Sequence, residues 1–350
     1  MSLHHSSVNA GERLKILDVL RGFALMGIFA ANVYIFDLES LSEVEDSFEA
    51  LAVGLADIPF LVFTSVFILN KMMALFSMLF GAGILLLAER LEARKEASLN
   101  IHYTRNGILA LVGLIHGLLW FGDVLLIYAL CAFVLFPLRR WSSRSFVLLG
   151  SMLWVAVLTT SYWPGSSGLI ADYALRAIAM MLLGMALYRS GILTAARDLE
   201  WYRKKCVRLL AVGLPVCLVA WGFYDANQSL SKLVHNIGVP CVALGYLCLV
   251  IHCYQRGVFP KLTARLAAAG QMALTNYLLQ TGLGATLVAI CNEVRGERVS
   301  VFWMMLITFA VWALQLGWSK PWMRRFEYGP VEWLWRSATY RRIQPFKSVG

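Results

Sequence analysis

Continuous apolar stretches, each about as long as the 20 residues that a helix needs to cross a bilayer, recur along the chain from residue 19 to residue 318. Only structures that satisfy their own backbone hydrogen bonds can cross lipid, namely helices and closed barrels. Strands of a barrel alternate apolar and polar residues, whereas these stretches are continuous. The sequence therefore predicts an all-α, polytopic bundle of membrane-spanning helices.

The composition agrees with a membrane protein and excludes other classes. The chain of 350 residues is 59% hydrophobic and 15% charged, with a mean hydropathy of +0.66. Soluble domains carry about 25% charged residues, which argues against a water-soluble enzyme and against a disordered chain. The net charge of +10 lies in short loops, so we expect no nucleic-acid partner. The seven cysteines lie in or beside apolar segments with no CxxC or Cys/His spacing, so we expect no metal site.

Ten spans with both termini cytoplasmic account best for the hydropathy. They are predicted at 16–37, 71–89, 106–122, 123–138, 145–163, 173–190, 206–224, 234–254, 267–290 and 299–318. The apolar segment 51–69 is interpreted as a re-entrant or interfacial helix, because only two residues separate it from the next span and Pro59 favours a break. This gives a cytoplasmic tail at 1–15, a helical domain at 16–318 and a surface tail at 319–350.

The distribution of basic residues decides between ten and eleven crossings. Cytoplasmic loops of membrane proteins are enriched in Lys and Arg. With ten crossings, 25 of the 31 basic residues fall inside, four fall outside, and Arg21 and Lys71 remain at membrane depth. An eleventh crossing at 51–69 would place most of them outside. We expect a multi-pass protein of the bacterial cytoplasmic (inner) membrane.

Charged residues inside the first span require a partner or a role. A charge in a span costs about 2.5–3.5 kcal/mol on insertion scales. Asp18 and Arg21 are spaced i,i+3 and share a helix face. Either they form a salt bridge that fixes helix packing, or Arg21 holds an anionic substrate group such as a phosphate or carboxylate.

The segment from His116 to Asp123 is the strongest candidate for chemistry. His116 lies in the outer half of the third predicted span, and Asp123 follows its end. Seven residues of continuous helix would separate them by about 10.5 Å. A turn at Phe121-Gly122 would instead bring Asp123 back to the imidazole, which could then act as a general base. The alternative is a structural histidine and a helix cap.

Other polar side chains at membrane depth have a structural and a functional interpretation. Asn32 in the first span, and Gln271, Thr275, Asn276 and Gln280 at helical spacing in the ninth, either bond neighbouring helices or line a cavity. Lys71 and His235 gather towards the outer side. Asp172 and Arg176, spaced i,i+4, are interpreted as a surface ion pair.

Five segments together resemble the YeiB-like bacterial membrane proteins, a family known as domain of unknown function 418. They are 17–24 with Asn32, Lys71 with 74–81, 113–117 with 122–123, 270–278, and 329–336. The opening motif is also similar to that of transmembrane acyltransferases, including heparan-α-glucosaminide N-acetyltransferase and the acyltransferase-3 type. That resemblance implies about ten helices, acyl transfer from cytosolic acyl-CoA, and an intramembrane histidine as base or acyl carrier. Many acyltransferase-3 proteins carry a histidine in the first span where this chain has Asn32.

Two main functional hypotheses follow. In the first, the chain is an acyltransferase without a permanently bound cofactor that uses acyl-CoA, for example acetyl-CoA, and a small-molecule, lipid or glycan acceptor. Its expected catalytic residues are His116, Asp123 and Asn32, and its expected substrate-binding residues are Asp18, Arg21, Lys71, Gln271, Asn276 and Gln280. In the second, it exports or transports a small amphipathic solute. A non-catalytic scaffold is a third interpretation. Membrane lipids are expected to surround the protein, and its small-residue patches would permit a homodimer.

Overall fold

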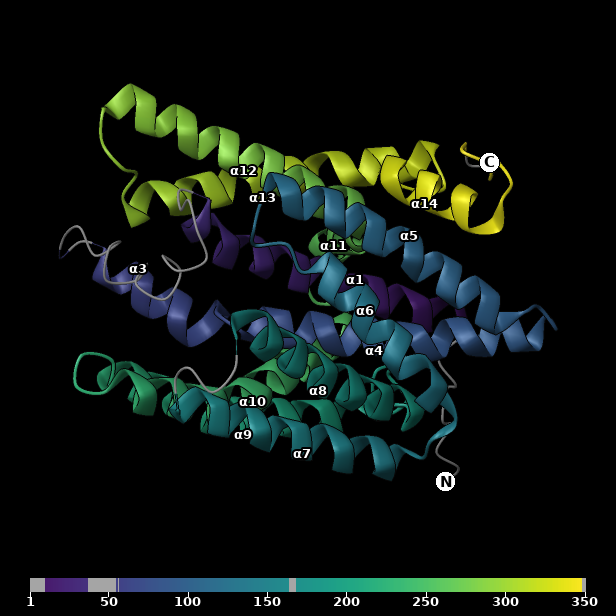
Figure 1. The fold of residues 1–350 in the computed structure, drawn as a ribbon, viewed down its shortest axis with the longest axis horizontal. Helices are drawn as coiled ribbons and strands as arrows, with labels where there is room; N and C mark the ends of the chain where they lie inside the picture. The colour runs from purple at the N-terminus through teal and green to yellow at the C-terminus, as the bar shows by residue number, and fades with distance from the viewer. Residues whose placement is uncertain (1–9, 37–54, 56, 164–167, 348–350) are drawn as a thin grey trace.

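The computed structural model describes residues 10–36, 55, 57–163 and 168–347, and within these the predicted all-α bundle is confirmed. The helices run roughly along one long axis (Figure 1). They are α1 (Ala10–Asn32), the 3-10 turn η1 (Val33–Ile35), α3 (Ile58–Phe63), the π-helical turn η2 (Thr64–Ile68), α4 (Lys71–Ala93), α5 (Ser98–Leu119), α6 (Leu125–Leu135), the 3-10 turn η3 (Phe136–Arg140), α7 (Ser143–Tyr162), α8 (Leu169–Arg189), α9 (Leu199–Gly222), α10 (Gln228–Gln255), α11 (Pro260–Gln271), α12 (Ala273–Arg295), α13 (Val301–Arg325) and α14 (Pro330–Tyr340).

Within the described residues, eight helical segments are long and apolar enough to cross a membrane. Seven of them contain α1, α7, α8, α9, α10, α12 and α13, and the eighth runs from α3 through α4. The predicted third and fourth spans, in α5 and α6, do not meet this criterion. Helix α6 has only 11 residues, which span about 16 Å.

Helices α5 and α6 form a hairpin in which α5 has 22 residues and α6 only 11. Figure 1 shows the turn between α5 and α6 near the middle of the long axis, whereas the connection between α12 and α13 lies at one end of it. Exposed leucines on α5, such as Leu118 and Leu119, present an apolar face to lipid. The turn of this hairpin therefore lies partway along the bundle and not at one of its ends.

Helices α1 and α4 form the centre of the bundle. In the most apolar part of each span, 72% of the α1 segment and 61% of the α3–α4 segment are buried inside the bundle. The corresponding shares are 17% for α7 and 22% for α9. Gly81 permits close packing here, because a Cβ on it would overlap the backbone oxygen of Met181 in α8. The small-residue run around Gly81 thus brings two helices together, as its composition suggests.

One helix break falls at the predicted boundary between segment 51–69 and the span from 71, and a second divides a span that the sequence predicts to be continuous. Pro59 lies in the first turn of α3, and the break comes later, at Leu69 and Asn70, where Asn70 has a left-handed φ of 64°. Figure 1 shows α3 extending beyond the end of α4, so it prolongs α4 towards that end of the molecule. The predicted ninth span is also divided, because α11 ends at Gln271 and α12 begins at Ala273.

Candidate functional site

The turn after α5 brings Asp123 back to His116. The Asp123 Oδ1 atom lies 2.8 Å from His116 Nδ1, and the two side chains are 3% and 7% exposed. Helix α5 ends as Trp120 becomes extended, and the chain reverses over residues 120–124 before α6 starts. The contact predicted for a turn at Phe121-Gly122 is therefore confirmed.

Neighbouring groups hold this carboxylate in place. Asp123 Oδ2 accepts a hydrogen bond from the Leu126 backbone at 3.2 Å, which ties it to the start of α6. The Tyr277 hydroxyl in α12 donates to Asp123 Oδ1 at 3.4 Å and accepts from the Val124 backbone at the same distance. Gly113 allows α5 and α6 to approach, because a Cβ there would overlap the Leu126 nitrogen. Three helices thus fix the orientation of Asp123.

The arrangement leaves the second imidazole nitrogen free for chemistry. A carboxylate oxygen only accepts hydrogen bonds, so a neutral His116 that donates from Nδ1 to Asp123 presents the lone pair of its Nε2. His116 Nε2 is buried and has no hydrogen-bond partner among the described residues. A buried polar atom without a partner costs about 1–3 kcal/mol, so a bound molecule that supplies a partner to Nε2 would be favoured at this position.

Trp120 supplies a second unpartnered polar atom beside the histidine. Its ring centroid lies 6.0 Å from that of His116, at 67° to it. Its Nε1 donor is also buried with no partner in the described ranges. Indole nitrogen can only donate. The rings that carry these two unpartnered nitrogens are therefore neighbours.

Asn32, the third predicted catalytic residue, is not joined to this pair. It is the last residue of α1, is half-buried, and makes no side-chain cap to η1. Phe36 follows one turn later, and its ring centroid lies 5.1 Å from that of Trp120. The end of α1 therefore borders the His116 site, and a catalytic role for Asn32 remains a prediction.

Three of the predicted substrate-binding residues, Asp18, Arg21 and Gln271, form a separate cluster. Arg21 Nη1 lies 2.9 Å from Asp18 Oδ1, and Gln271 Nε2 donates to Asp18 Oδ2 at 3.2 Å. The Arg21 side chain is 30% exposed and the Asp18 side chain 16% exposed. The salt bridge predicted as one alternative is present, and it leaves part of the guanidinium accessible.

Asn276 and Gln280 bond helices to one another. The Asn276 amide donates to Ala269 O at 3.1 Å and to Ser319 Oγ at 3.2 Å. The Gln280 amide donates to Gln315 Oε1 at 2.8 Å. Asn276 is 0% exposed and Gln280 is 3% exposed. This geometry matches the interhelical alternative, and Gln271 lies on a different helix from the other two, so the predicted stripe is not continuous.

Lys71 satisfies the backbone at the break between η2 and α4. Its Nζ donates to Ser65 O at 2.5 Å and lies 3.2 Å from His235 Nε2. The Tyr246 hydroxyl donates to Phe67 O at 2.9 Å. Because a helix end leaves carbonyls without partners, these side chains complete the broken helix, and a cation suits its C-terminal end. Lys71 itself is 0% exposed.

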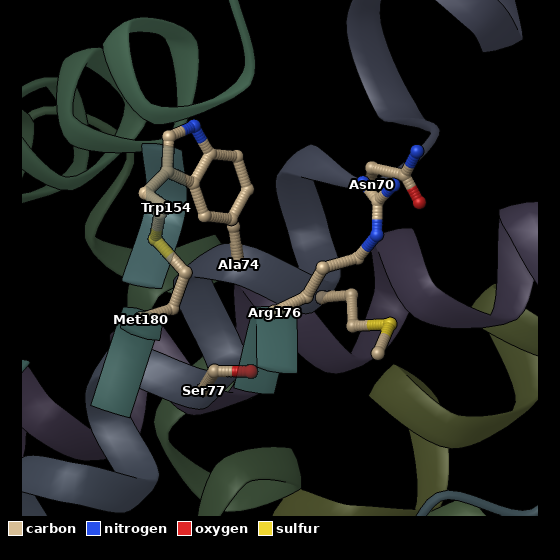
Figure 2. A pocket seen from close by; sticks show the side chains of 7 residues that line it. Asn70, Ala74, Ser77, Trp154, Arg176 and Met180 are labelled. Carbon is tan, nitrogen blue, oxygen red and sulfur yellow. The ribbon is translucent and has the colours of Figure 1, made fainter. Parts of the chain in front are cut away.

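The predicted ion pair of Asp172 and Arg176 is present, but it is only partly exposed and belongs to a larger network. Arg176 Nε donates to Asp172 Oδ2 at 2.6 Å and its Nη1 donates to Asn236 Oδ1 at 2.6 Å. The Arg176 side chain is 16% exposed. This network joins α8 to α10 and borders a small pocket. The pocket is lined by Asn70, Met73, Ala74, Ser77, Trp154, Arg176 and Met180 (Figure 2).

Sequence reasoning missed Tyr277, Trp120 and Glu332. Nothing in the local sequence places Trp120 against His116 or Tyr277 against Asp123. Glu332 of α14 accepts the backbone N–H groups of Leu274 at 2.6 Å and Thr275 at 3.0 Å, and so caps α12. Burial raises the pKa of Glu332, and its hydrogen bonds from Thr275 oppose that effect. In the part of the chain that the structure describes, no three His, Cys, Asp or Glu residues could together hold a metal ion.

Comparison with known proteins identifies relatives over nearly the whole chain. Residues 187–342 match the family described as "Protein of unknown function (DUF418)". The chain is 30% identical to the uncharacterized protein YeiB of Escherichia coli (strain K12), over 95% of this chain and 98% of that one. The chain belongs to this family. It is also 30% identical to the uncharacterized protein YxaH of Bacillus subtilis (strain 168), over 95% and 96% of the two chains.

A third relative is the uncharacterized 39.9 kDa protein in the amylase 3′ region of Bacillus acidopullulyticus. It is 26% identical, over 95% of this chain and 96% of that protein. No solved structure matches the chain. The resemblance to YeiB-like proteins is thus confirmed, and the His116–Asp123 hairpin lies outside the segment that matches the family description.

Proposed function

We propose that the chain is a membrane-embedded acyltransferase in which His116 is the general base. The observation that carries the proposal is the buried, unpartnered Nε2 of an imidazole whose Nδ1 is held by Asp123 at 2.8 Å. A base oriented by a carboxylate is the arrangement that activates hydroxyl and amine nucleophiles in acyl-transfer enzymes. The nearby unpartnered Nε1 of Trp120 supports the same chemistry.

The reaction balances with an acyl thioester as donor. His116 Nε2 removes the proton from an acceptor hydroxyl or amine, and the acceptor atom bonds to the thioester carbonyl carbon. The carbonyl electrons move onto oxygen, where the Trp120 N–H stabilises them. The C–S bond then breaks, the acyl group stays on the acceptor, and the thiolate of CoA takes the proton back from His116. Asp123 keeps the ring in the required tautomer throughout.

The expected location agrees with a cytosolic donor. A multi-pass protein with bacterial relatives fits the inner membrane, where cytosolic acyl-CoA meets the basic inner loops. The acceptor would then approach the hairpin turn from the lipid or from the outer side.

Turnover of acyl-CoA tests the proposal. We would purify the protein in nanodiscs, add acetyl-CoA or longer acyl-CoAs with bacterial lipid and glycan extracts, and measure free CoA by chromatography. Thiol dyes are unsuitable because the chain has seven free cysteines. His116→Ala is expected to abolish release, and His252→Ala, which removes a histidine bonded to Leu199 O far along the chain, is the matched control. Equal release by wild type and His116→Ala would contradict the proposal.

Broken helices favour transport as the second candidate. Helix α4 is preceded by a π-helical turn and a left-handed Asn70, and Lys71 and His235 meet there without lipid exposure. Discontinuous helices with buried charges are typical of secondary transporters. Proteoliposomes that take up a labelled amphipathic solute in a His235-dependent manner, with no CoA release, would support transport over acyl transfer.

A further inference from the structure

Four arginines from four different helices gather at the inner end of the bundle. They are Arg21 in α1, Arg90 in α4, Arg105 in α5 and Arg336 in α14. Arg90 interacts electrostatically with Arg21 and Arg336, and Arg105 interacts with Arg336 and Arg21. Arg21 also lies against α4, with Nη2 3.8 Å from where a Cβ on Gly83 would be. These four arginines are called the arginine cluster below.

The cluster has more positive charge than its acidic neighbours neutralise. Asp18 is bonded to Arg21 and interacts with Arg90. Glu332 interacts with Arg105, but its oxygens accept the N–H groups of Leu274 and Thr275. Among the described residues, Arg90, Arg105 and Arg336 form no salt bridge. Like charges held together destabilise a fold unless an anion binds between them.

Aromatic rings orient two of the guanidinium groups and leave their edges free. Arg105 lies 3.8 Å from the ring centroid of Trp335, and Arg336 lies 4.6 Å from that of Tyr328. Stacking occupies the face of a guanidinium without removing its charge. Its N–H donors remain at the edge, in the fork geometry that matches phosphate oxygens.

Helix α14 closes the cluster from the cytoplasmic tail. Trp335 Nε1 donates to the Arg105 backbone oxygen at 2.8 Å, so the helix that carries Arg336 is fixed to the helix that carries Arg105. Arg90 is exposed, while Arg21, Arg105 and Arg336 are half-buried. The cluster is therefore accessible from one side and built from rigid elements, as a binding site requires.

We propose that the arginine cluster binds a ligand that carries two or more phosphate groups at the inner face of the bundle. This inference deepens the proposed function and rests on it only for the identity of the ligand, the phosphate-bearing end of an acyl donor. The same chemistry could come from a soluble polyphosphate compound or from an anionic lipid headgroup of the inner leaflet.

Binding of defined probes tests the site. Inorganic pyrophosphate and CoA would be titrated by calorimetry into protein in phosphatidylcholine nanodiscs, and thermal unfolding would be compared in nanodiscs with and without phosphatidic acid. Arg336→Gln and Arg90→Gln are each expected to weaken soluble-probe binding about tenfold, the effect of one charge-assisted hydrogen bond. Arg324→Gln, an exposed arginine of α13, is the control and should bind as wild type does.

The outcomes separate the two sources and the two proposals. Pyrophosphate binding that depends on Arg336 supports a soluble ligand, whereas stabilisation by phosphatidic acid alone, lost in Arg336→Gln, supports a lipid headgroup. His116→Ala should bind pyrophosphate and CoA as wild type does. If that variant loses turnover but keeps this binding, the loss concerns the catalytic step and not the arginine cluster. Absence of both effects in wild type, or equal effects in Arg324→Gln and Arg336→Gln, would overturn the site.

Discussion

The His116 Nδ1 atom and the Asp123 Oδ1 atom lie 2.8 Å apart across a turn that ends inside the bundle. We expect Asp123→Asn to reduce CoA release about 100-fold or more, because an amide can present N–H to Nδ1 and shift the proton to Nε2. Chromatographic measurement of CoA checks this. Unchanged release in Asp123→Asn would show that the carboxylate does not set the tautomer.

Replacing Trp120 by Phe is expected to lower the activity without lowering the stability. Trp120→Phe keeps an aromatic ring against His116 and Phe36 but removes the unpartnered Nε1 donor. Turnover is expected to fall about 10- to 100-fold if this donor stabilises the oxyanion. Thermal stability should stay the same or rise, because a buried donor without a partner is lost. A variant with full activity would exclude Trp120 from the reaction.

Replacing Gly81 by Ala is expected to disturb the packing of α4 against α8. Gly81→Ala would push α4 away from Met181 of α8, at a cost of about 1–3 kcal/mol in the free energy of unfolding. Gly107→Ala is the matched control, because nothing lies within 4 Å of its added Cβ. That change should stabilise α5 slightly, by about 0.5–1 kcal/mol. Thermal unfolding in detergent would show the two opposite signs, and equal shifts would contradict the packing described.

The buried carboxyl group of Glu332 is expected to make the stability of the protein depend on pH. Its folded-state pKa is raised by burial above the ordinary value of 4.5, so the folded state binds more protons than the unfolded state. Stability is therefore lost as pH rises above about 4.5 and through the raised pKa. Glu332→Gln, which retains an oxygen to accept the Leu274 and Thr275 N–H groups, should remove this slope. A parallel pH dependence of melting temperature in wild type and variant would contradict it.

The sequence predicts the fold class and the best candidate residue because both depend on local patterns. Continuous apolar stretches are sufficient to indicate an all-α membrane bundle. The spacing of His116 and Asp123, with Gly122 between them, allows the turn that joins them. The short length of α6 is not visible in hydropathy, since residues 125–135 continue into apolar neighbours.

The remaining features depend on contacts between distant segments. The break at Asn70 is stable because the side chains of Lys71 and Tyr246 donate hydrogen bonds to the backbone carbonyls of Ser65 and Phe67. The break at Met272 persists because Glu332, about 60 residues further along, caps α12. Neither partner can be identified from the sequence around the break. The same holds for Tyr277, whose contact with Asp123 requires the packing of α12 on the α5–α6 hairpin.

A single-turnover experiment tests the central claim most directly. Wild-type protein in nanodiscs, in excess over acetyl-CoA and supplied with acceptor extract, should release CoA in proportion to the donor added, with the acyl label transferred to an acceptor. His116→Ala, folded by the criterion of thermal unfolding, should release none above the uncatalysed rate. Release of CoA by both proteins at one rate, or by neither, would contradict a catalytic imidazole at position 116.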